Sequence, residues 1–455
     1  MQAKSLSLLH YIQSSVFLRV VLIGFVILLL QIPISMIDSQ ITARQETKRE
    51  AVSDITSKWG KKQTVIAPRL IVPFTEIKQW RDDKNKTHIS RIKHFATFLP
   101  ENLTIQARTS NEVRKRGLFE VPVYQSNISI SGTFNKPIFD RWSDKPELIH
   151  WEQAEIAMGV SDVRATQKQV NIKWNNEVIA FEPGLGLTSL NNAPGLHARI
   201  TSLEKDKVSS FKITMQLNGS KSLFFAPMGK NSDIQIDSDW PHPSFQGYKL
   251  PNQRTVREDG FSANWSVSQI SRNYPQQWLG TKFYNKQFNE TLVGVDFISP
   301  VDSYRMTDRS SKYVMLFLLL TFTVIWLIEV LTRIRVHLLQ YLFIGLGMCM
   351  FYLLLLALSE HIGFSLAYLT ASLAVVILCA GYAKAVLKTK RNAIILGSSI
   401  AILYLYLFTL LHEQSYSLLF GSLGVFIGLA VVMYSTRNID WYDLVNVDKK
   451  TMTNE

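Results

Sequence analysis

The sequence predicts an α+β membrane protein with six transmembrane helices, one N-terminal and five C-terminal, and a large β-rich, sandwich-like periplasmic domain. Three observations support this class. The hydrophobic residues, 47% of 455, are segregated and not spread evenly. Residues 313–434 are almost entirely apolar, in stretches of about the 20 residues that cross a bilayer. Segment 38–311 has ordinary polar composition and is long enough for its own core. The predicted parts are a cytoplasmic stub with a signal-anchor helix at 1–37, the β-rich domain at 38–311, a five-helix bundle at 312–435 and a cytoplasmic tail at 436–455.

The first apolar run, Val20 to Ile37, follows Lys4 and Arg19, as the apolar part of a secretory signal follows its charged start. No small-residue cleavage site follows it, so we expect an uncleaved signal anchor with a cytoplasmic N-terminus. Residues 38–58 then place apolar side chains at helical spacing among alternating charges, which predicts an amphipathic helix that ends at Gly60.

The polar segment carries strand signals from residue 64 onward. Short β-branched runs occur at 65–74, 127–134 and 170–174. Two hairpins are predicted, one turning at Asn218–Gly219 into 222–226 and one turning at Asp259–Gly260 into 261–267. Without βα alternation or a nucleotide fingerprint, these signals favour an antiparallel sandwich with a few edge helices, one of them at 152–163.

Five further spans are predicted at 313–332, 336–358, 362–383, 393–411 and 416–434. The second and third are joined by a loop with Arg333 and Arg335, and the fourth and fifth by a basic loop at 384–391. The other two turns, around Glu360 and Glu413, contain neither Lys nor Arg. Because basic loops stay on the cytoplasmic side, both termini should be cytoplasmic and the large domain periplasmic, in a bacterial inner (plasma) membrane.

The net charge of +13 is diffuse, and the densest basic run is only Arg114 to Arg116. This pattern argues against a nucleic-acid partner and favours the phospholipid bilayer, with other envelope proteins as an open alternative. Cys349 and Cys379 both lie in apolar spans, so no disulfide framework supports the polar domain. The sequence does not specify an oligomeric state.

Long ordered strings of the chain resemble one known family. They are Arg116–Tyr124, Asn218–Ser220, Asp239–Phe245 and Asp259–Phe261 in the polar segment, and Lys312–Tyr313, His337, Gln340–Tyr341, Phe351–Phe364 and Ile439–Tyr442 around the membrane block. They resemble the CreD family of bacterial inner-membrane proteins over almost the whole chain. The resemblance implies a role in cell envelope integrity, a link to a two-component regulatory system, and no accepted catalytic residues.

Polar residues near lipid are candidates for function because they are costly to keep there. Glu329 could mark a proton or ion path, or could pair with Arg333 four residues later. Glu360 with His361, and His412 with Glu413, should both lie on the outer side, where they could bind a metal such as zinc or merely end their helices. The remaining candidate polar residues are His337, Gln340, Tyr341 and Ser359.

In the polar domain, Asp237 and Asp239 beside His242 could form a hydrolytic site. The prolines at 241 and 243 indicate more simply a strand that leaves its sheet at a bend. There is no Gly-x-Ser-x-Gly elbow, so we predict no catalytic residues, no enzyme and no cofactor, with a hydrolase as the minor alternative. Gly421, Gly424 and Gly428 form a small-residue stripe that should allow close helix packing inside the bundle, with dimerisation of the bundle as the lesser alternative.

Two functions remain in competition at this point. The leading one is an envelope-integrity factor that acts through protein or lipid contacts, without turnover. The alternative is a transporter or flippase-like carrier that uses Glu329, Glu360 and His361. The absence of an evident inverted repeat in the five C-terminal spans weighs against the carrier.

Overall fold

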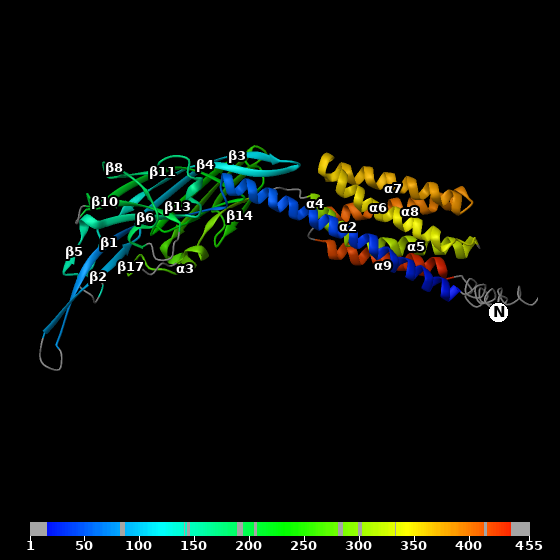
Figure 1. Cartoon of the computed structure of the whole chain (residues 1–455), viewed down its shortest axis with the longest axis horizontal. Coiled ribbons are helices and arrows are strands. Elements are labelled where there is room, and N and C mark those ends of the chain that lie inside the picture. Colours follow the sequence, from blue (N-terminus) through cyan, green and yellow to red (C-terminus); the bar gives the residue numbers. More distant parts are fainter. Residues whose placement is uncertain are drawn as a thin grey trace, which may run out of the picture. The chain divides into compact units, whose positions relative to one another are not determined.

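The computed structural model describes residues 16–437, apart from 82–86, 141, 143–145, 189–193, 204–206, 281–284, 299–302, 333 and 414–415. The chain forms two compact units. One contains Met1–Arg49 and Val301–Glu455, and the other contains Glu50–Pro300. Figure 1 labels most of the helices and strands of the two units.

Six helices within the described part of the chain are long and apolar enough to span a membrane, as the sequence predicts. They are α2 (Val16–Trp59), α5 (Val314–Thr332), α6 (Leu338–Ile362), α7 (Phe364–Val386), α8 (Lys390–His412) and α9 (Ser417–Thr436). The short α4 (Ser303–Ser311) precedes α5, and α3 (Asn285–Glu290) belongs to the other unit.

The predicted anchor and the predicted amphipathic segment form one continuous helix, α2, which contains Pro33 and ends just before Gly60. Its buried side chains recur every three or four residues: Ile23, Val26, Leu30, Ile34, Ile37 and Ile41. The opposite face exposes Phe25, Leu28, Ile32 and Met36. This division gives α2 one face for its neighbouring helices and one for lipid. Gly345 of α6 permits the contact, because a Cβ there would collide with Leu30 and Phe322.

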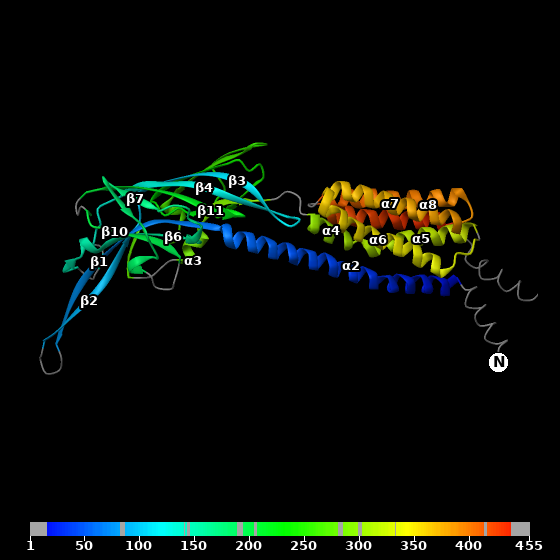
Figure 2. The same cartoon turned by 45° about the horizontal axis from the view of Figure 1, so that its top comes forward.

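The second unit is a sandwich of two sheets (Figure 2). The ten-stranded sheet contains β1 (Gln63–Arg81), β2 (Thr87–Phe98), β5 (Leu148–Ile149), β6 (Ala154–Val160), β9 (Glu182–Pro183), β10 (Gly195–Ile200), β12 (Ser222–Ala226), β14 (Pro243–Gly247), β17 (Gln277–Leu279) and β18 (Val293–Phe297). The eight-stranded sheet contains β3 (Asn102–Arg116), β4 (Phe119–Phe134), β7 (Asn171–Trp174), β8 (Glu177–Ala180), β11 (Ser209–Ser220), β13 (Asn231–Ser238), β15 (Gln253–Arg257) and β16 (Gly260–Ser268).

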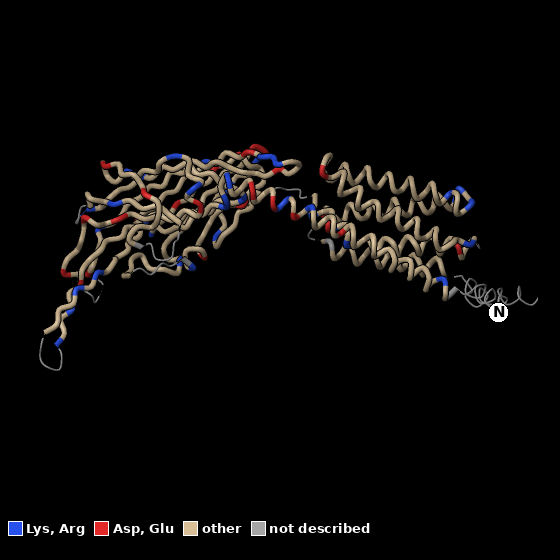
Figure 3. Tube along the Cα trace, in the orientation of Figure 1, with Lys and Arg blue, Asp and Glu red and all other residues tan. Residues whose placement is uncertain are grey.

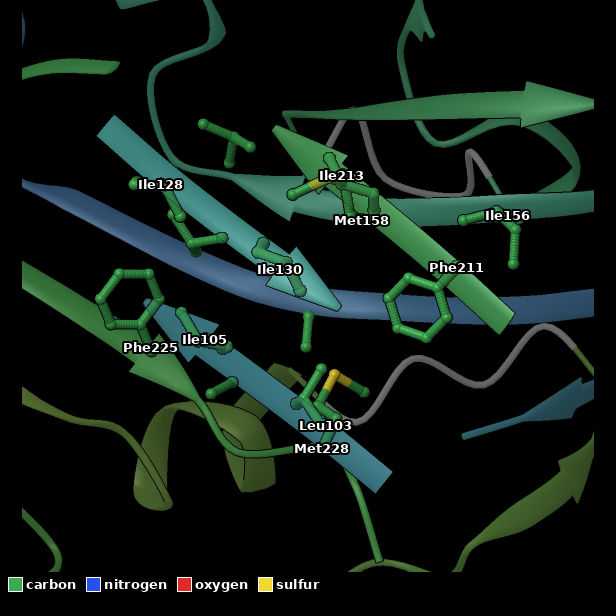
Figure 4. Close-up of a cluster of buried hydrophobic side chains, with 14 of the residues drawn as sticks. Leu103, Ile105, Ile128, Ile130, Ile156, Met158, Phe211, Ile213, Phe225 and Met228 are labelled. Atoms are coloured by element: carbon green, nitrogen blue, oxygen red, sulfur yellow. The ribbon is translucent and has the colours of Figure 1, made fainter. Parts of the chain in front are cut away.

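The main path of the first sheet runs β14-β18-β12-β1-β6-β10-β9, and the second runs β15-β16-β13-β3-β4-β11-β7-β8. The core lies between them (Figure 4). Leu103, Ile105 and Ile130 come from the second sheet, and Met158 and Phe225 from the first. Each such side chain contributes roughly 1.5–3 kcal/mol when fully buried. Most strand pairs are antiparallel, as predicted, but β1 with β12 and β3 with β13 are parallel.

The hairpin predicted at Asn218–Gly219 is wrong. Both residues lie inside β11, and the chain crosses from one sheet to the other at Lys221, whose φ is +64°. β12 therefore pairs with β1 and β18, not with β11. Gly219 is required for packing, because a Cβ there would collide with the ring of Tyr124.

The second predicted hairpin is confirmed, but its turn lies one residue earlier than predicted: Arg257 is opposite Gly260, so Glu258 and Asp259 form the turn and Gly260 begins β16. The helix predicted at 152–163 is wrong. A 3₁₀ turn at Trp151–Gln153 leads into β6, which is buried on both faces between β1 and β10. A short, continuous apolar run of this kind does not distinguish a helix from a central strand. Further 3₁₀ turns lie at Val163–Ala165, Gly186–Thr188 and Gln269–Ser271.

Candidate functional site in the membrane helices

Charged residues of α5 to α9 lie near the helix ends (Figure 3), and two carboxylates among them, Glu329 and Glu360, have side chains only 4% and 7% exposed. Glu329, three residues before the end of α5, has a side chain only 4% exposed. It accepts hydrogen bonds from the Tyr341 hydroxyl at 3.0 Å and the Val336 backbone N–H at 3.0 Å, and it forms an ion pair with Arg19 of α2. We call Arg19, Glu329, Val336 and Tyr341 the Glu329 cluster.

The predicted candidates His337 and Gln340 position this cluster. His337 is the N-cap of α6, and its Nδ1 accepts from the backbone N–H of Leu339 at 3.2 Å. The Gln340 side chain in turn accepts from the His337 backbone N–H at 2.9 Å. This reciprocal pair satisfies N–H groups that a helix start leaves unpaired. It fixes the first turn of α6, which carries Tyr341 to Glu329.

Glu329 therefore contacts Val336, which is near in sequence, and also Tyr341 and Arg19, which are farther away along the chain. Arg19 lies in the first turns of α2, and its side chain is 26% exposed. Sequence reasoning did not find Arg19 as the partner, and Arg333, which it proposed, lies outside the described residues. One sequence feature indicates Arg19 as the partner of Glu329: it is a basic residue just before the first apolar run, and the predicted topology places it on the same side of the membrane as the end of α5.

The second carboxylate, Glu360, lies near the end of α6 and accepts a hydrogen bond from the Tyr304 hydroxyl of α4 at 2.9 Å. Nε of Arg44 in α2 lies 3.5 Å from the same carboxylate oxygen. The ammonium of Lys48 lies 5.4 Å from the centre of the Tyr304 ring, close enough for a cation–π contact. We call Arg44, Lys48, Tyr304 and Glu360 the Glu360 cluster.

The remaining membrane candidates lie apart from these contacts. The hydroxyl of buried Ser359 donates to the Leu356 carbonyl at 3.0 Å. His361 and Glu413 are exposed, and Nδ1 of His412 lies 3.0 Å from the Phe408 carbonyl. Within the part of the chain that the structure describes, no three His, Cys, Asp or Glu side chains gather closely enough to hold a metal ion.

The glycine stripe of α9 lies against two helices. A Cβ on Gly424 would collide with the ring of Tyr406 in α8, and one on Gly428 would touch Leu320 in α5. Gly421 faces open space. Two of the three glycines thus permit the internal packing that the sequence predicts.

In the sandwich, the Asp239 carboxylate is hydrogen-bonded to residues of β3. It accepts from the backbone N–H and the side-chain amide of Asn111 at 2.8 and 2.7 Å, and from the Ser110 hydroxyl at 3.2 Å. Asp237 accepts from Gln235 at 3.0 Å. The bend that the two prolines predict is confirmed, since β13 ends at Ser238 in one sheet and β14 begins at Pro243 in the other.

Comparisons with known proteins identify relatives over nearly the full length. A family model described as "Inner membrane protein CreD" matches residues 15–442. A curated protein of Escherichia coli (strain K12), named "Inner membrane protein CreD", is 33% identical over 435 residues, which cover 95% of each chain. Among solved structures, an M1 zinc metallopeptidase from Deinococcus radiodurans aligns with 40% of this chain and 42% of its own, at 7% identity and a TM-score of 0.21, too low to indicate a shared fold.

Proposed function

The chain belongs to the CreD family of inner membrane proteins, and on that premise we propose that it contributes to cell envelope integrity and to tolerance of envelope stress, antibiotics and toxins. It acts through protein or lipid contacts and not by catalysis, and its expression is linked to a two-component regulatory system. Its β-rich unit lies in the periplasm, and both termini lie in the cytoplasm.

The observation that carries this proposal is that both membrane carboxylates are engaged in contacts between helices. Glu329 and Glu360 are each bound by an arginine of α2 and by a tyrosine hydroxyl. Ion pairs between helices hold those helices in place, because breaking one leaves a charge without its partner. The polar groups near lipid therefore serve assembly, and the β-rich unit is the part available for contacts.

The proposed orientation rests on the short loops and has a direct test. Arg335 and the basic loop at 384–391 lie on one side, and the turns at Glu360 and Glu413 on the other. An enzyme reporter that is active only outside the cytosol should work when it is fused near residue 200 and fail when it is fused in the 384–391 loop. Activity in the reverse pattern would make the periplasmic assignment wrong.

The functional test is deletion of the gene, with growth measured under envelope-active toxins and cell-wall antibiotics. We expect lower tolerance in the deletion strain and recovery on expression of the full chain. Transcription should also depend on a response regulator of a two-component system, measured in strains that lack one regulator at a time. Unchanged tolerance of every agent after deletion would remove the basis for the proposal.

A carrier is the second candidate, since Glu329 is a buried carboxylate inside a span, a position where charge is costly. The variant Glu329→Gln separates the two functions. A carrier that needs this charge loses function even when the folded protein accumulates normally. In an integrity factor, function should fall only as far as the amount of folded protein falls, measured by immunoblot of membranes and complementation in the same strain.

A further inference from the structure

One part of the sandwich extends beyond it as a two-stranded ribbon. Among the described residues, 76–81 of β1 and 87–92 of β2 pair only with each other, with Lys78 opposite Ser90 and Trp80 opposite His88. We call these two stretches the arm. Figures 1 and 2 show the arm projecting from the body of the sandwich. β1 has 19 residues, so Arg81 at the far end of the arm lies roughly 60 Å along the strand from Gln63, just beyond the end of α2.

The arm exposes large apolar side chains on both of its faces. Trp80 is 55% exposed and stacks on His88, with ring centres 4.4 Å apart. Ile89 is 63% exposed and lies on the other face, opposite Gln79, because successive side chains of a strand alternate. A two-stranded ribbon is only marginally stable in water, so exposing such residues is costly unless they are covered by a partner.

The arm is also basic. Lys78, Arg81 and Arg91 are exposed. Glu76 is the only acidic residue in the described arm, and it is already bound by His94 at 2.8 Å and Lys78 at 3.4 Å. Tryptophan and arginine are the residues most often found at the energetic centre of protein interfaces.

We propose that the arm docks into a concave, acidic groove on a different protein of the cell envelope, with Trp80 and Ile89 as its apolar anchors. This inference rests on the proposed function, because it names the contact through which an integrity factor would act. A concave partner fits better than a lipid surface, since a flat surface covers one face of a ribbon and leaves either Trp80 or Ile89 in water.

A second copy of this chain fits less well than another protein. Two surface grooves of the sandwich are of mixed charge. One, of about 600 Å³, is lined by Lys62, Glu290 and Asp296, among others, and the other, of about 310 Å³, by Arg257 and Asp259. Neither offers the uniformly acidic lining that complements a basic arm.

The test is photo-crosslinking of the full chain in living cells. The probe is p-benzoylphenylalanine placed at Ile89, and the matched control places it at Ile270, which is 90% exposed on the same unit. We expect a discrete protein adduct from position 89 and none from position 270. Arg91→Glu should reduce the adduct about tenfold or more, because it sets like charges against each other in the interface. Arg257→Glu, an exposed arginine on β15, should leave the adduct unchanged.

Trp80→Ala should likewise lose the adduct and lower antibiotic and toxin tolerance while the protein accumulates normally in membranes. An adduct with twice the mass of the 51.9 kDa chain would assign the arm to a second copy, and a lipid adduct would assign it to the bilayer; either result overturns the inference. So would equal adducts from positions 89 and 270, no adduct, or one that survives Arg91→Glu. If the deletion strain lacks a phenotype while the specific adduct forms, the proposed function fails and the arm contact stands.

Discussion

Glu329→Gln is the substitution that tests the Glu329 cluster most directly. It keeps the size of the side chain and removes its charge. Three groups lose their anionic acceptor: the Arg19 guanidinium, the Tyr341 hydroxyl at 3.0 Å and the Val336 backbone N–H at 3.0 Å. The matched control is Glu413→Gln, at the exposed end of α8.

The magnitude follows from burial. Breaking a fully buried ion pair by removing one partner costs about 3–5 kcal/mol. Arg19 keeps a quarter of its side-chain surface exposed, and can turn its guanidinium toward the headgroups, so the cost should fall to about 2–3 kcal/mol. Glu413→Gln removes an exposed charge and should change stability by less than about 0.5 kcal/mol.

The assay is thermal unfolding of the purified full chain in detergent micelles. A double-mutant cycle of Glu329→Gln with Tyr341→Phe should give a coupling energy of about 1 kcal/mol, since the two side chains share a hydrogen bond. Tyr416→Phe, at an exposed tyrosine, is the control for the loss of a hydroxyl. Equal stabilities for Glu329→Gln and Glu413→Gln, or zero coupling with Tyr341→Phe, would refute the claim that the Glu329 cluster stabilises the packing of the helices.

Three further outcomes are expected from the same unfolding assay. Gly424→Val should lower the unfolding temperature because its side chain meets Tyr406, whereas Gly421→Val, in open space, should leave it unchanged. Glu360→Gln should cost about 1–2 kcal/mol, less than Glu329→Gln, because Arg44 is half exposed and 3.5 Å away. Burial raises the pKa of the Asp296 carboxyl above its ordinary 3.8, although Lys62 acts in the opposite sense. A raised folded-state pKa means that the stabilising contribution is present below pH 3.8 and lost as pH rises through the folded-state value. Asp296→Asn should therefore be more stable than the parent at pH 7, and the difference should disappear below pH 3.8.

The sequence predicts the helical unit better than the strand connections, for a physical reason. A span needs about 20 apolar residues in a row, a local property that composition reveals directly. A hairpin at Asn218–Gly219 is also predicted from local sequence. Whether it forms depends on whether β12 pairs with β11 or with strands that are distant in sequence. β12 finds β1 and β18, more than 60 residues away on either side, and no local signal encodes that choice.

The same distinction applies to the Glu329 cluster. The sequence identifies four residues in or next to this cluster, because polar side chains near lipid are unusual. They are Glu329, His337, Gln340 and Tyr341. The sequence alone does not pair Glu329 with Arg19, because the two residues are 310 positions apart along the chain and only folding brings their side chains together. For Glu360 the position was predicted, but Arg44 and Tyr304 come from two other helices.

Together the two clusters fix how α2 lies against α6. Arg19 and Arg44 are 25 positions apart, roughly 37 Å along α2, and Tyr341 and Glu360 are 19 positions apart, roughly 28 Å along α6, close to the thickness of a hydrocarbon core. Because Arg19 reaches the start of α6 through Glu329, and Arg44 reaches its end, the two helices run parallel. A slip of α2 by one turn, 5.4 Å, would break the ion pairs at both ends at once. The apolar contact opposes the same slip, because Leu30 lies against Gly345, where there is no room for a Cβ. The two ion pairs and this contact therefore set the register of α2 together.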